Sequence, residues 1–132
     1  MKLILYSHAL QAGFPSPADD YKETALSLDE HLIQHPAATY LARACGDSME
    51  AVGIFDRDLL IIDRSLEPRN GDVVVAAIDG ELTCKLLDTQ NQVLKAANPK
   101  YKPIPISDEA ELLIEGVIMA SVRYHRHPIC SP

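Results

Sequence analysis

The chain has 132 residues, of which 47% are hydrophobic and 23% are charged, and 12 Lys and Arg against 19 Asp and Glu give it a net charge of −7. This length suits one domain with an arm and excludes two full cores, and the apolar fraction excludes a disordered chain. The excess of acid argues against direct binding of nucleic acid, because phosphate contacts need clustered Lys and Arg. The sequence has no run of 18 apolar residues, so we expect no membrane span.

The net charge is unevenly distributed along the chain. Residues 1–12 carry +1, residues 13–30 carry −4 and the remainder carries −4. The acidic segment opens with Phe-Pro-Ser-Pro at residues 14–17, and each proline restricts the residue before it to extended backbone. We therefore expect an extended, solvated and flexible N-terminal arm.

A short helix is expected at the end of this arm. Ser-Leu-Asp-Glu at residues 27–30 has the form of a capping box, which marks a helix start. The helix is expected to run to about His35 and to stop before Pro36. With this helix, the acidic arm is expected to cover residues 13–36.

Strands are expected from residue 37 onward. Apolar and β-branched runs bounded by turn residues indicate strands at Thr39–Ala44, Leu59–Ile62, Val73–Ile78, Glu81–Leu87, Gln92–Ala97 and Leu112–Tyr124. Asp-Gly at residues 79–80 is a two-residue hairpin signal, and Gly116 marks a bend in a final long strand or pair of strands. Prolines at 99, 103 and 105 mark a loop or an edge. The pattern predicts a mostly-β domain over residues 37–127, with a frayed end at 128–132.

The cysteines and histidines carry no metal or disulfide pattern. Cys45, Cys84 and Cys130 are odd in number and widely spaced, which is neither a disulfide framework nor a zinc motif. A reducing cytoplasm is therefore expected, with Cys45 and Cys84 as small packing residues. His125 and His127 can share a strand face but lack further ligands, so we expect neither a metal nor another cofactor.

The first candidate catalytic residue is Ser48, in the Gly-Asp-Ser-Met sequence at residues 46–49. A serine after a glycine turn can project its hydroxyl out of the packed body. If a helical turn starts at Met49, the backbone N–H groups of Asp47 and Ser48 are free to hold an oxyanion. The hydroxyl still needs a base to become a nucleophile. The simpler interpretation is that Gly-Asp-Ser is only a turn.

The second candidate is Lys85, on a predicted strand whose two faces are both largely apolar. Desolvation disfavours the ammonium form and lowers the pKa of a lysine. A fall from about 10.4 to roughly 7, worth on the order of 4–5 kcal/mol, would let the neutral amine act as a base. Ser48 and Lys85 would then form a Ser/Lys dyad. The alternative is that Lys85 extends its charged end to water.

Five segments then carry a resemblance to a known family. They are Gly-Phe-Pro-Ser-Pro-Ala-Asp-Asp-Tyr at 13–21, Leu-Ile-Gln-His-Pro-Ala-Ala-Thr-Tyr at 32–40, Gly-Asp-Ser-Met at 46–49, Asp-Leu-Leu-Ile-Ile-Asp at 58–63 and Gly-Asp-Val-Val-Val-Ala-Ala-Ile-Asp-Gly-Glu at 71–81. In order and with consistent spacing, they closely resemble the LexA/UmuD family of self-cleaving serine peptidases (S24-like), in particular its UmuD-like SOS-mutagenesis members. The similarity runs from about Gly13 to about Tyr124.

The resemblance implies roles for particular residues. In the family the serine of Gly-Asp-Ser-Met is the nucleophile and the lysine after the Asp-Gly hairpin is the general base, which assigns these roles to Ser48 and Lys85. The family's self-cleaved bond falls just before Phe-Pro-Ser-Pro, at Ala12–Gly13 here, so residues 1–12 form a leader that is removed. The implied fold is a LexA/signal-peptidase-like domain of antiparallel strands in a pseudo-barrel.

The resemblance also implies partners. The trimmed protein is expected to form a homodimer and to join an error-prone, UmuC-like Y-family DNA polymerase subunit in translesion synthesis during the SOS response. RecA filaments on single-stranded DNA are expected to stimulate the cleavage. The expected location is the bacterial cytoplasm, for a protein that is encoded by a bacterium or by a plasmid or phage.

Alternatives remain open from the sequence alone. One is a non-cleaving interaction module with a vestigial dyad. A LexA-type repressor is disfavoured, because the residues before the predicted β-domain hold no helix-turn-helix and the arm is acidic. The 12-residue leader is shorter than expected for the family. The sequence leaves open cleavage in cis or in trans, the dimer strength and the particular polymerase.

Overall fold

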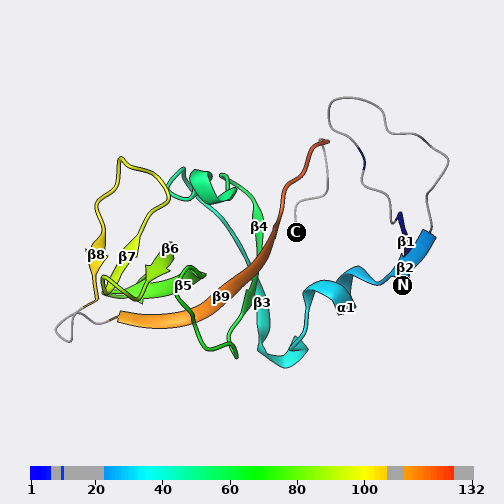
Figure 1. The fold of residues 1–132 in the computed structure, drawn as a ribbon, viewed down its shortest axis with the longest axis horizontal. Coiled ribbons are helices and arrows are strands. Elements are labelled where there is room, and N and C mark those ends of the chain that lie inside the picture. Colours follow the sequence, from blue (N-terminus) through cyan, green and yellow to red (C-terminus); the bar gives the residue numbers. More distant parts are fainter. Residues whose placement is uncertain (7–9, 11–22, 107–111, 127–132) are drawn as a thin grey trace. The chain divides into compact units, whose positions relative to one another are not determined.

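The computed structural model describes residues 1–6, 10, 23–106 and 112–126 (Figure 1). The chain divides into two compact units, Met1–Gln34 and His35–Pro132. The segment expected to be the most extended part of the arm, residues 13–22, and the end expected to fray, residues 128–132, lie outside the described residues. Within the described ranges, no helix has the length and apolar character needed to cross a membrane.

The first unit contains a two-stranded sheet that the sequence did not predict. Strand β1 (Leu3–Tyr6) pairs antiparallel with β2 (Glu23–Leu26), and the register sets Leu3 opposite Leu26 and Tyr6 opposite Glu23. The hydroxyl of Thr24 adds a hydrogen bond of 3.3 Å to the carbonyl of Leu5. Part of the expected leader is thus paired with part of the expected arm.

The helix of the first unit is shorter than expected. Helix α1 spans Leu28–Leu32 and ends before the predicted position near His35. Ser27 is its N-cap, as the sequence predicts, but its hydroxyl bonds the Asp29 carboxylate and caps no backbone N–H. The carbonyl of Ser27 accepts from the amide of His31 at 2.9 Å. The capping box expected at residues 27–30 is therefore replaced by a local contact between two side chains.

The second unit is a seven-stranded antiparallel sheet, and the expected mostly-β fold of the LexA-like type is confirmed (Figure 1). The strand order is β3-β4-β9-β5-β6-β7-β8. The strands are β3 (Thr39–Arg43), β4 (Leu59–Asp63), β5 (Val73–Ile78), β6 (Glu81–Asp88), β7 (Val93–Lys95), β8 (Ile104–Pro105) and β9 (Leu112–Val122). The Asp-Gly pair forms the predicted β5–β6 hairpin, with both residues at positive φ.

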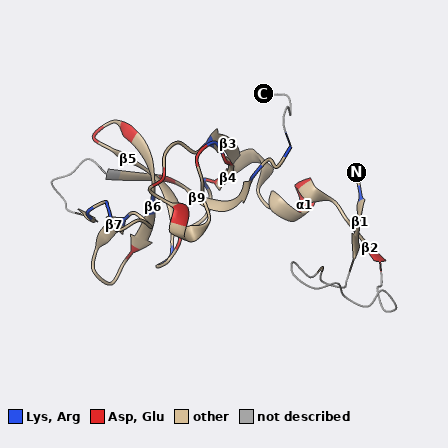
Figure 2. Cartoon of the chain, turned by 90° about the horizontal axis from the view of Figure 1, so that it is seen from above, with Lys and Arg blue, Asp and Glu red and all other residues tan. Residues whose placement is uncertain are grey.

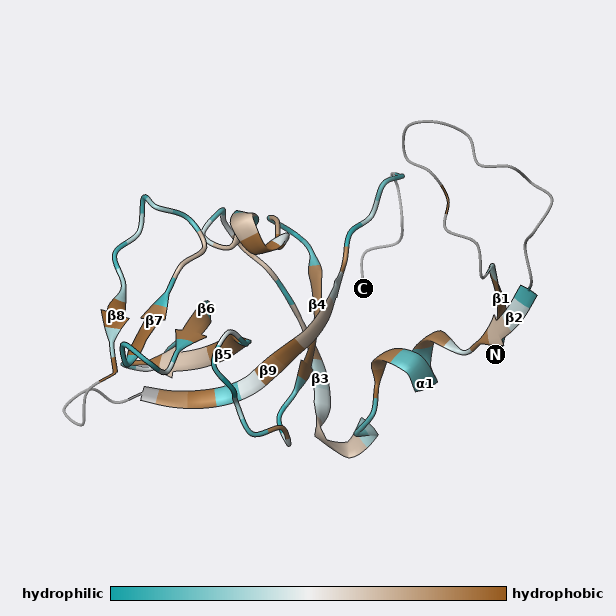
Figure 3. Ribbon diagram, in the orientation of Figure 1, coloured by the Kyte–Doolittle hydropathy of each residue, from teal (hydrophilic) through white to brown (hydrophobic). Residues whose placement is uncertain are grey.

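The core lies on both faces of this sheet. Successive residues of β5 alternate between two clusters, because side chains on a strand point to opposite faces. One cluster contains Met49, Ile54, Leu60, Ile62 and Val75. The other contains Val74, Ala76, Leu87, Leu94 and Val117. Hydrophobic residues concentrate on the strands (Figure 3), whereas charged residues of both signs are spread over the strands and loops (Figure 2).

Strand β9 is one continuous, curved strand between β4 and β5 (Figure 1). Its pairing shifts register opposite Ile61/Ile62 of β4 and again opposite Val75/Ala76 of β5. Gly116 lies at the second shift, and a Cβ atom there would stand 2.5 Å from Cγ2 of Ile62. The predicted bend at Gly116 is thus a bulge where only glycine fits without moving the neighbouring strand.

A buried carboxylate anchors the start of the second unit. Asp63, at the end of β4, is 1% exposed. It accepts hydrogen bonds from the amide and hydroxyl of Ser65 at 2.9 and 2.7 Å, and its other oxygen lies 2.6 Å from Nδ1 of His35. These partners, Ser65 first and His35 second, lower the pKa of Asp63 to about 2. The contact fixes the chain to the sheet at His35, immediately after the first unit.

We expect Asp63 to make the stability of the second unit sensitive to acid. The pKa of Asp63 in the folded chain, about 2, lies below the ordinary value of 3.8. The contribution of the Asp63 carboxylate to the free energy of unfolding is therefore complete above about pH 4 and is lost as the pH falls toward 2. Urea unfolding of the wild type and of Asp63→Asn between pH 2 and 6 should show a steeper acid loss in the wild type. Asp79→Asn, at an exposed turn position, is the control. Parallel curves for wild type and Asp63→Asn would contradict the assignment.

Candidate active site

Ser48 lies in the connection between β3 and β4. The base of this connection is closed by two backbone hydrogen bonds of 2.8 Å, from the amide of Ala44 to the carbonyl of Asp58 and from the amide of Arg57 to the carbonyl of Ala44. The helical turn expected after Met49 is present as a 3-10 turn, Glu50–Val52. Met49 is buried in the core, so the backbone beside Ser48 is fixed by packing.

An ion pair from β9 holds the far side of this connection. The carboxylate of Asp58 is 2% exposed and accepts two hydrogen bonds from Arg123, at 3.1 and 2.9 Å, and one from the amide of Phe55 at 2.9 Å. The same guanidinium donates to the carbonyl of Gly53 at 2.7 Å and lies 3.9 Å from the centre of the Phe55 ring. Arg123 thus ties the end of β9 to the connection that carries Ser48, and it lowers the pKa of Asp58.

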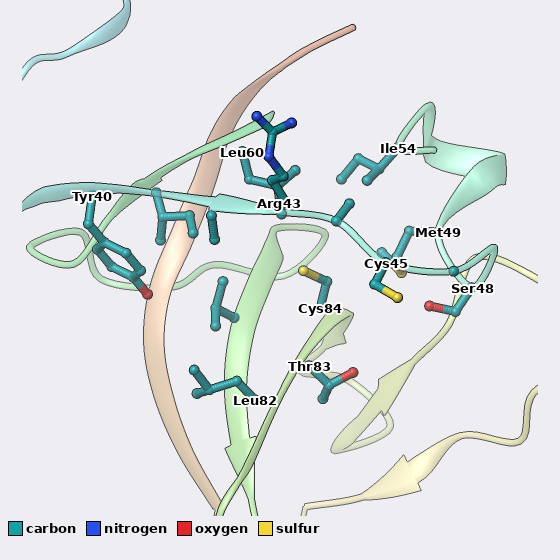
Figure 4. Close-up of a pocket in the computed structure, with 15 residues that line it drawn as sticks. Tyr40, Arg43, Cys45, Ser48, Met49, Ile54, Leu60, Leu82, Thr83 and Cys84 are labelled. Carbon is teal, nitrogen blue, oxygen red and sulfur yellow. The ribbon is translucent and has the colours of Figure 1, made fainter. Parts of the chain in front are cut away.

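Ser48 lines a cavity of about 210 Å³. In Figure 4 the Ser48 and Thr83 side chains lie toward one end of the cavity, and Tyr40 lies toward the other. The walls are mostly apolar and come from β3, β4, β5, β6 and the 45–54 segment, including Ala42, Ala44, Ile54, Leu60, Ile62 and Val75. A serine hydroxyl at the end of an apolar recess can meet a substrate where water is restricted.

Lys85 lies on β6, opposite Val74 of β5, and is half-buried. It lines a second hollow together with Tyr101 and Lys102. The two hollows share Leu82 and Thr83, so the candidate nucleophile and base flank the same two residues of β6. Among the described residues, Ser48 and Lys85 make no hydrogen bond to each other.

The turn before Ser48 has free backbone donors. Within the described part of the chain, the amides of Asp47 and Ser48 donate no hydrogen bond. The amide of Gly46 donates to the Asp56 carboxylate at 2.9 Å, and the amide of Glu50 donates to the carbonyl of Asp47 at 3.3 Å. The two amides expected to hold an oxyanion are therefore unused, while the backbone on either side of them is fixed.

Sequence reasoning missed the side chains that hold Asp47. Tyr101 donates its hydroxyl proton to Asp47 Oδ1 at 2.7 Å, and Lys100 Nζ lies 3.4 Å from Oδ2. These contacts, Tyr101 first and Lys100 second, lower the pKa of Asp47, and Asp47 in turn raises the pKa of Tyr101. Tyr101 lies in the proline-marked segment that the sequence identified only as a loop or an edge, so no local signal pointed to it.

The remaining candidate residues divide into described and undescribed ones. Ala12 and Gly13, the expected cleavage site, lie outside the described residues.

Cys45 and Cys84 both line the Ser48 cavity. Cys45 is exposed, so the expectation of a buried packing residue is wrong for it, whereas burial raises the pKa of the Cys84 thiol. Among the described residues, no three His, Cys, Asp or Glu side chains gather as a metal site.

The family model described as Peptidase S24-like matches residues 4–119. The chain belongs to this family. Protein SamA of Salmonella typhimurium is 42% identical over 123 residues, which cover 92% of this chain and 86% of that protein. Protein ImpA of Escherichia coli is 44% identical over 122 residues, which cover 92% of this chain and 80% of that protein. A LexA repressor of Ectopseudomonas mendocina is 39% identical over 115 residues, covering 85% of this chain and 56% of the repressor. The resemblance drawn from the sequence motifs is thereby confirmed.

We expect Arg123→Met to loosen the connection that carries Ser48. The change leaves the buried Asp58 carboxylate without its cation, so the urea midpoint at pH 7 should fall. Because Arg123 lowers the pKa of Asp58, the deficit should shrink as the pH falls below about 4, where the carboxylate becomes protonated. Arg57→Gln, at a side chain that is 85% exposed, should leave the midpoint unchanged. A deficit independent of pH would contradict the role given to the ion pair.

Proposed function

We propose that this S24-like protein is a serine endopeptidase that cleaves its own Ala12–Gly13 bond, with Ser48 as nucleophile and Lys85 as general base. The observation that supports this most is the placement of the two side chains. Ser48 lines an apolar cavity, Lys85 lines the neighbouring hollow, and both hollows share Leu82 and Thr83. The family membership supports peptidase chemistry at this place.

The proposed chemistry needs only groups of this chain and water. Neutral Lys85 takes the hydroxyl proton of Ser48 while Oγ bonds to the carbonyl carbon of Ala12. The amides of Asp47 and Ser48 stabilise the oxyanion. The bond to the Gly13 nitrogen then breaks, and Lys85 returns its proton to that amine. Water, activated by Lys85, releases the Ala12 carboxyl group from Ser48 and restores the serine.

The substrate segment itself completes the environment of the base in this proposal. Lys85 is half-buried, and loss of water around a lysine amine favours its neutral form. A peptide bound in the hollow that Lys85 shares with Tyr101 would cover the amine of Lys85. The methyl group of Ala12 and the absence of a side chain at Gly13 would let the bond approach Ser48. The site is therefore expected to become reactive only when the arm is bound.

The test is self-cleavage of the purified full chain at alkaline pH, followed by mass. The wild type should lose residues 1–12, and Ser48→Ala and Lys85→Ala should each abolish the loss, with the rate rising with pH as neutral lysine becomes more abundant. Lys102→Ala, which removes another lysine of the same hollow, is the matched control and should still be processed. Cleavage at Ala12–Gly13 in Ser48→Ala would contradict the mechanism.

The polymerase role follows from the resemblance to UmuD-like members and is part of the same proposal. The trimmed chain is proposed to act as a cytoplasmic bacterial homodimer that binds an error-prone Y-family DNA polymerase subunit, with RecA filaments on single-stranded DNA stimulating the cleavage. The full chain carries −7, and removal of residues 1–12, which carry +1, leaves −8; this excess of acid favours contacts with proteins over contacts with phosphates. No DNA contact by this chain is required.

Binding to such a polymerase subunit should depend on processing. The experiment compares two proteins for retention on an immobilised Y-family polymerase subunit: a chain that begins at Gly13, and full-length Ser48→Ala. The chain that begins at Gly13 is expected to bind more tightly. RecA with single-stranded DNA and ATP should speed cleavage of the wild type at neutral pH. An unchanged mass with and without the filament, together with equal binding of both forms, would support the non-cleaving interaction module instead.

A further inference from the structure

A loop distant in sequence holds the turn that carries Ser48. Within residues 97–101, between β7 and β8, three side chains reach one residue of that turn. Tyr101 and Lys100 contact the two carboxylate oxygens of Asp47 at 2.7 and 3.4 Å, and Asn98 Nδ2 donates to its main-chain carbonyl at 3.2 Å. Both the side chain and the backbone of Asp47 are therefore fixed from the same side.

The main chain of this loop takes part as well. The carbonyl of Ala97 accepts from the amide of Ala51 at 3.1 Å, beyond Ser48 in the sequence. The loop also closes on itself, because the amide of Tyr101 donates to the carbonyl of Asn98 at 3.1 Å and the amide of Lys100 donates to Asn98 Oδ1 at 3.0 Å. The 97–101 loop is thus held by its own hydrogen bonds, and it contacts the chain both before Ser48, at Asp47, and after it, at Ala51.

We propose that residues 97–101 are a positioning loop for the nucleophile, with Tyr101 as its principal positioning residue through the hydrogen bond to Asp47. This inference rests on the proposed function of Ser48. The amides of Asp47 and Ser48 are the proposed oxyanion donors, and such donors act only when they are held in place before the reaction. Tyr101 fixes Asp47. Asp47 supplies one of the two proposed donors, and the other is the amide of the next residue, Ser48.

The contact suits positioning better than stabilisation of the fold. The side chains of Lys100 and Asp47 are 72% and 38% exposed, and ion pairs at such exposed sites contribute little to stability. The hydrogen bond from Tyr101 to a carboxylate is charge-assisted and therefore short and directional. Tyr101 also lines the hollow of Lys85, so one side chain adjoins the base and holds the turn of the nucleophile.

The first test compares self-cleavage rates of full-length variants. Tyr101→Phe removes only the hydroxyl and should slow self-cleavage about tenfold, with the urea midpoint and the pH dependence unchanged, since a misplaced donor in a catalytic site costs about this much or more. Asp47→Ala should slow cleavage similarly. Asp47→Asn keeps an acceptor for Tyr101 and should cleave several-fold faster than Asp47→Ala. Tyr124→Phe is the control, because the Tyr124 hydroxyl has no hydrogen-bond partner in the described part of the chain.

Combining the two changes separates positioning from a general structural effect. If Tyr101 acts through Asp47, Tyr101→Phe with Asp47→Ala should cleave no more slowly than Asp47→Ala alone. A wild-type rate in Tyr101→Phe, a loss that only follows the unfolded fraction, or full additivity of the two losses would overturn the inference.

A second measurement is independent of cleavage. Backbone 15N relaxation of the Ser48→Ala chain, with and without Tyr101→Phe, should give lower order parameters at residues 46–49 when the hydroxyl is absent. Unchanged order parameters there would overturn the positioning role. If the wild type never loses residues 1–12 while Tyr101→Phe still loosens this turn, the proposed function fails and the positioning contact stands.

Discussion

The structure of the second unit depends on the position of β9 between β4 and β5. In the described part of the chain these two strands do not pair with each other, and β9 joins the β3–β4 side of the sheet to the β5–β8 side. The close approach of Gly116 to Ile62 makes this junction tight. At the other end of β9, Arg123 reaches the buried Asp58 and the carbonyl of Gly53. One strand therefore connects the sheet and anchors the segment that carries Ser48.

The candidate site is built by polar contacts at the ends of strands, on a base of apolar packing. Met49 and Ile54 are buried in the core and fix the connection between β3 and β4 by packing. Asp58 with Arg123 holds it from the β9 side, and Asp47 with Tyr101 holds it from the β7–β8 side. The Ser48 amide and hydroxyl lie between these fixed points and have no hydrogen-bond partner among the residues that the structure describes. Rigid surroundings with unused groups at their centre are suited to binding a transition state.

Much of the fold was predictable because its signals are local. The strands from β3 to β7 and β9 follow apolar runs bounded by turn residues, and the β5–β6 hairpin follows from the Asp-Gly pair. The β1–β2 pairing was not predicted, because each strand has only four residues and no two-residue turn joins them. Helix α1 ends at Leu32, earlier than expected, because Ile33 already has extended backbone, with φ −115° and ψ 97°.

The site was predictable only in part, because only some of its residues stand in a local sequence signal. Ser48 and Lys85 stand in recognisable local sequences, whereas their surroundings come from distant segments. Arg123 and Asp58 are separated by 65 positions, and Tyr101 and Asp47 by 54. No periodicity or turn chemistry relates such pairs, since they meet only after the sheet has formed. The sequence thus identified candidate reacting groups, and the structure adds what holds them.

The pairing of β1 with β2 has a consequence for the proposed processing. β1 lies before the Ala12–Gly13 bond and β2 lies after it, and four residue pairs join the strands. Hydrolysis of the peptide bond breaks none of these pairings, so the cut alone leaves the leader on the chain as a bound peptide. An isolated two-stranded sheet is only marginally stable. If the proposed cleavage takes place, release of the leader would therefore be a dissociation equilibrium. An irreversible chemical stage would then be followed by a reversible one, which a high concentration of free leader peptide would oppose.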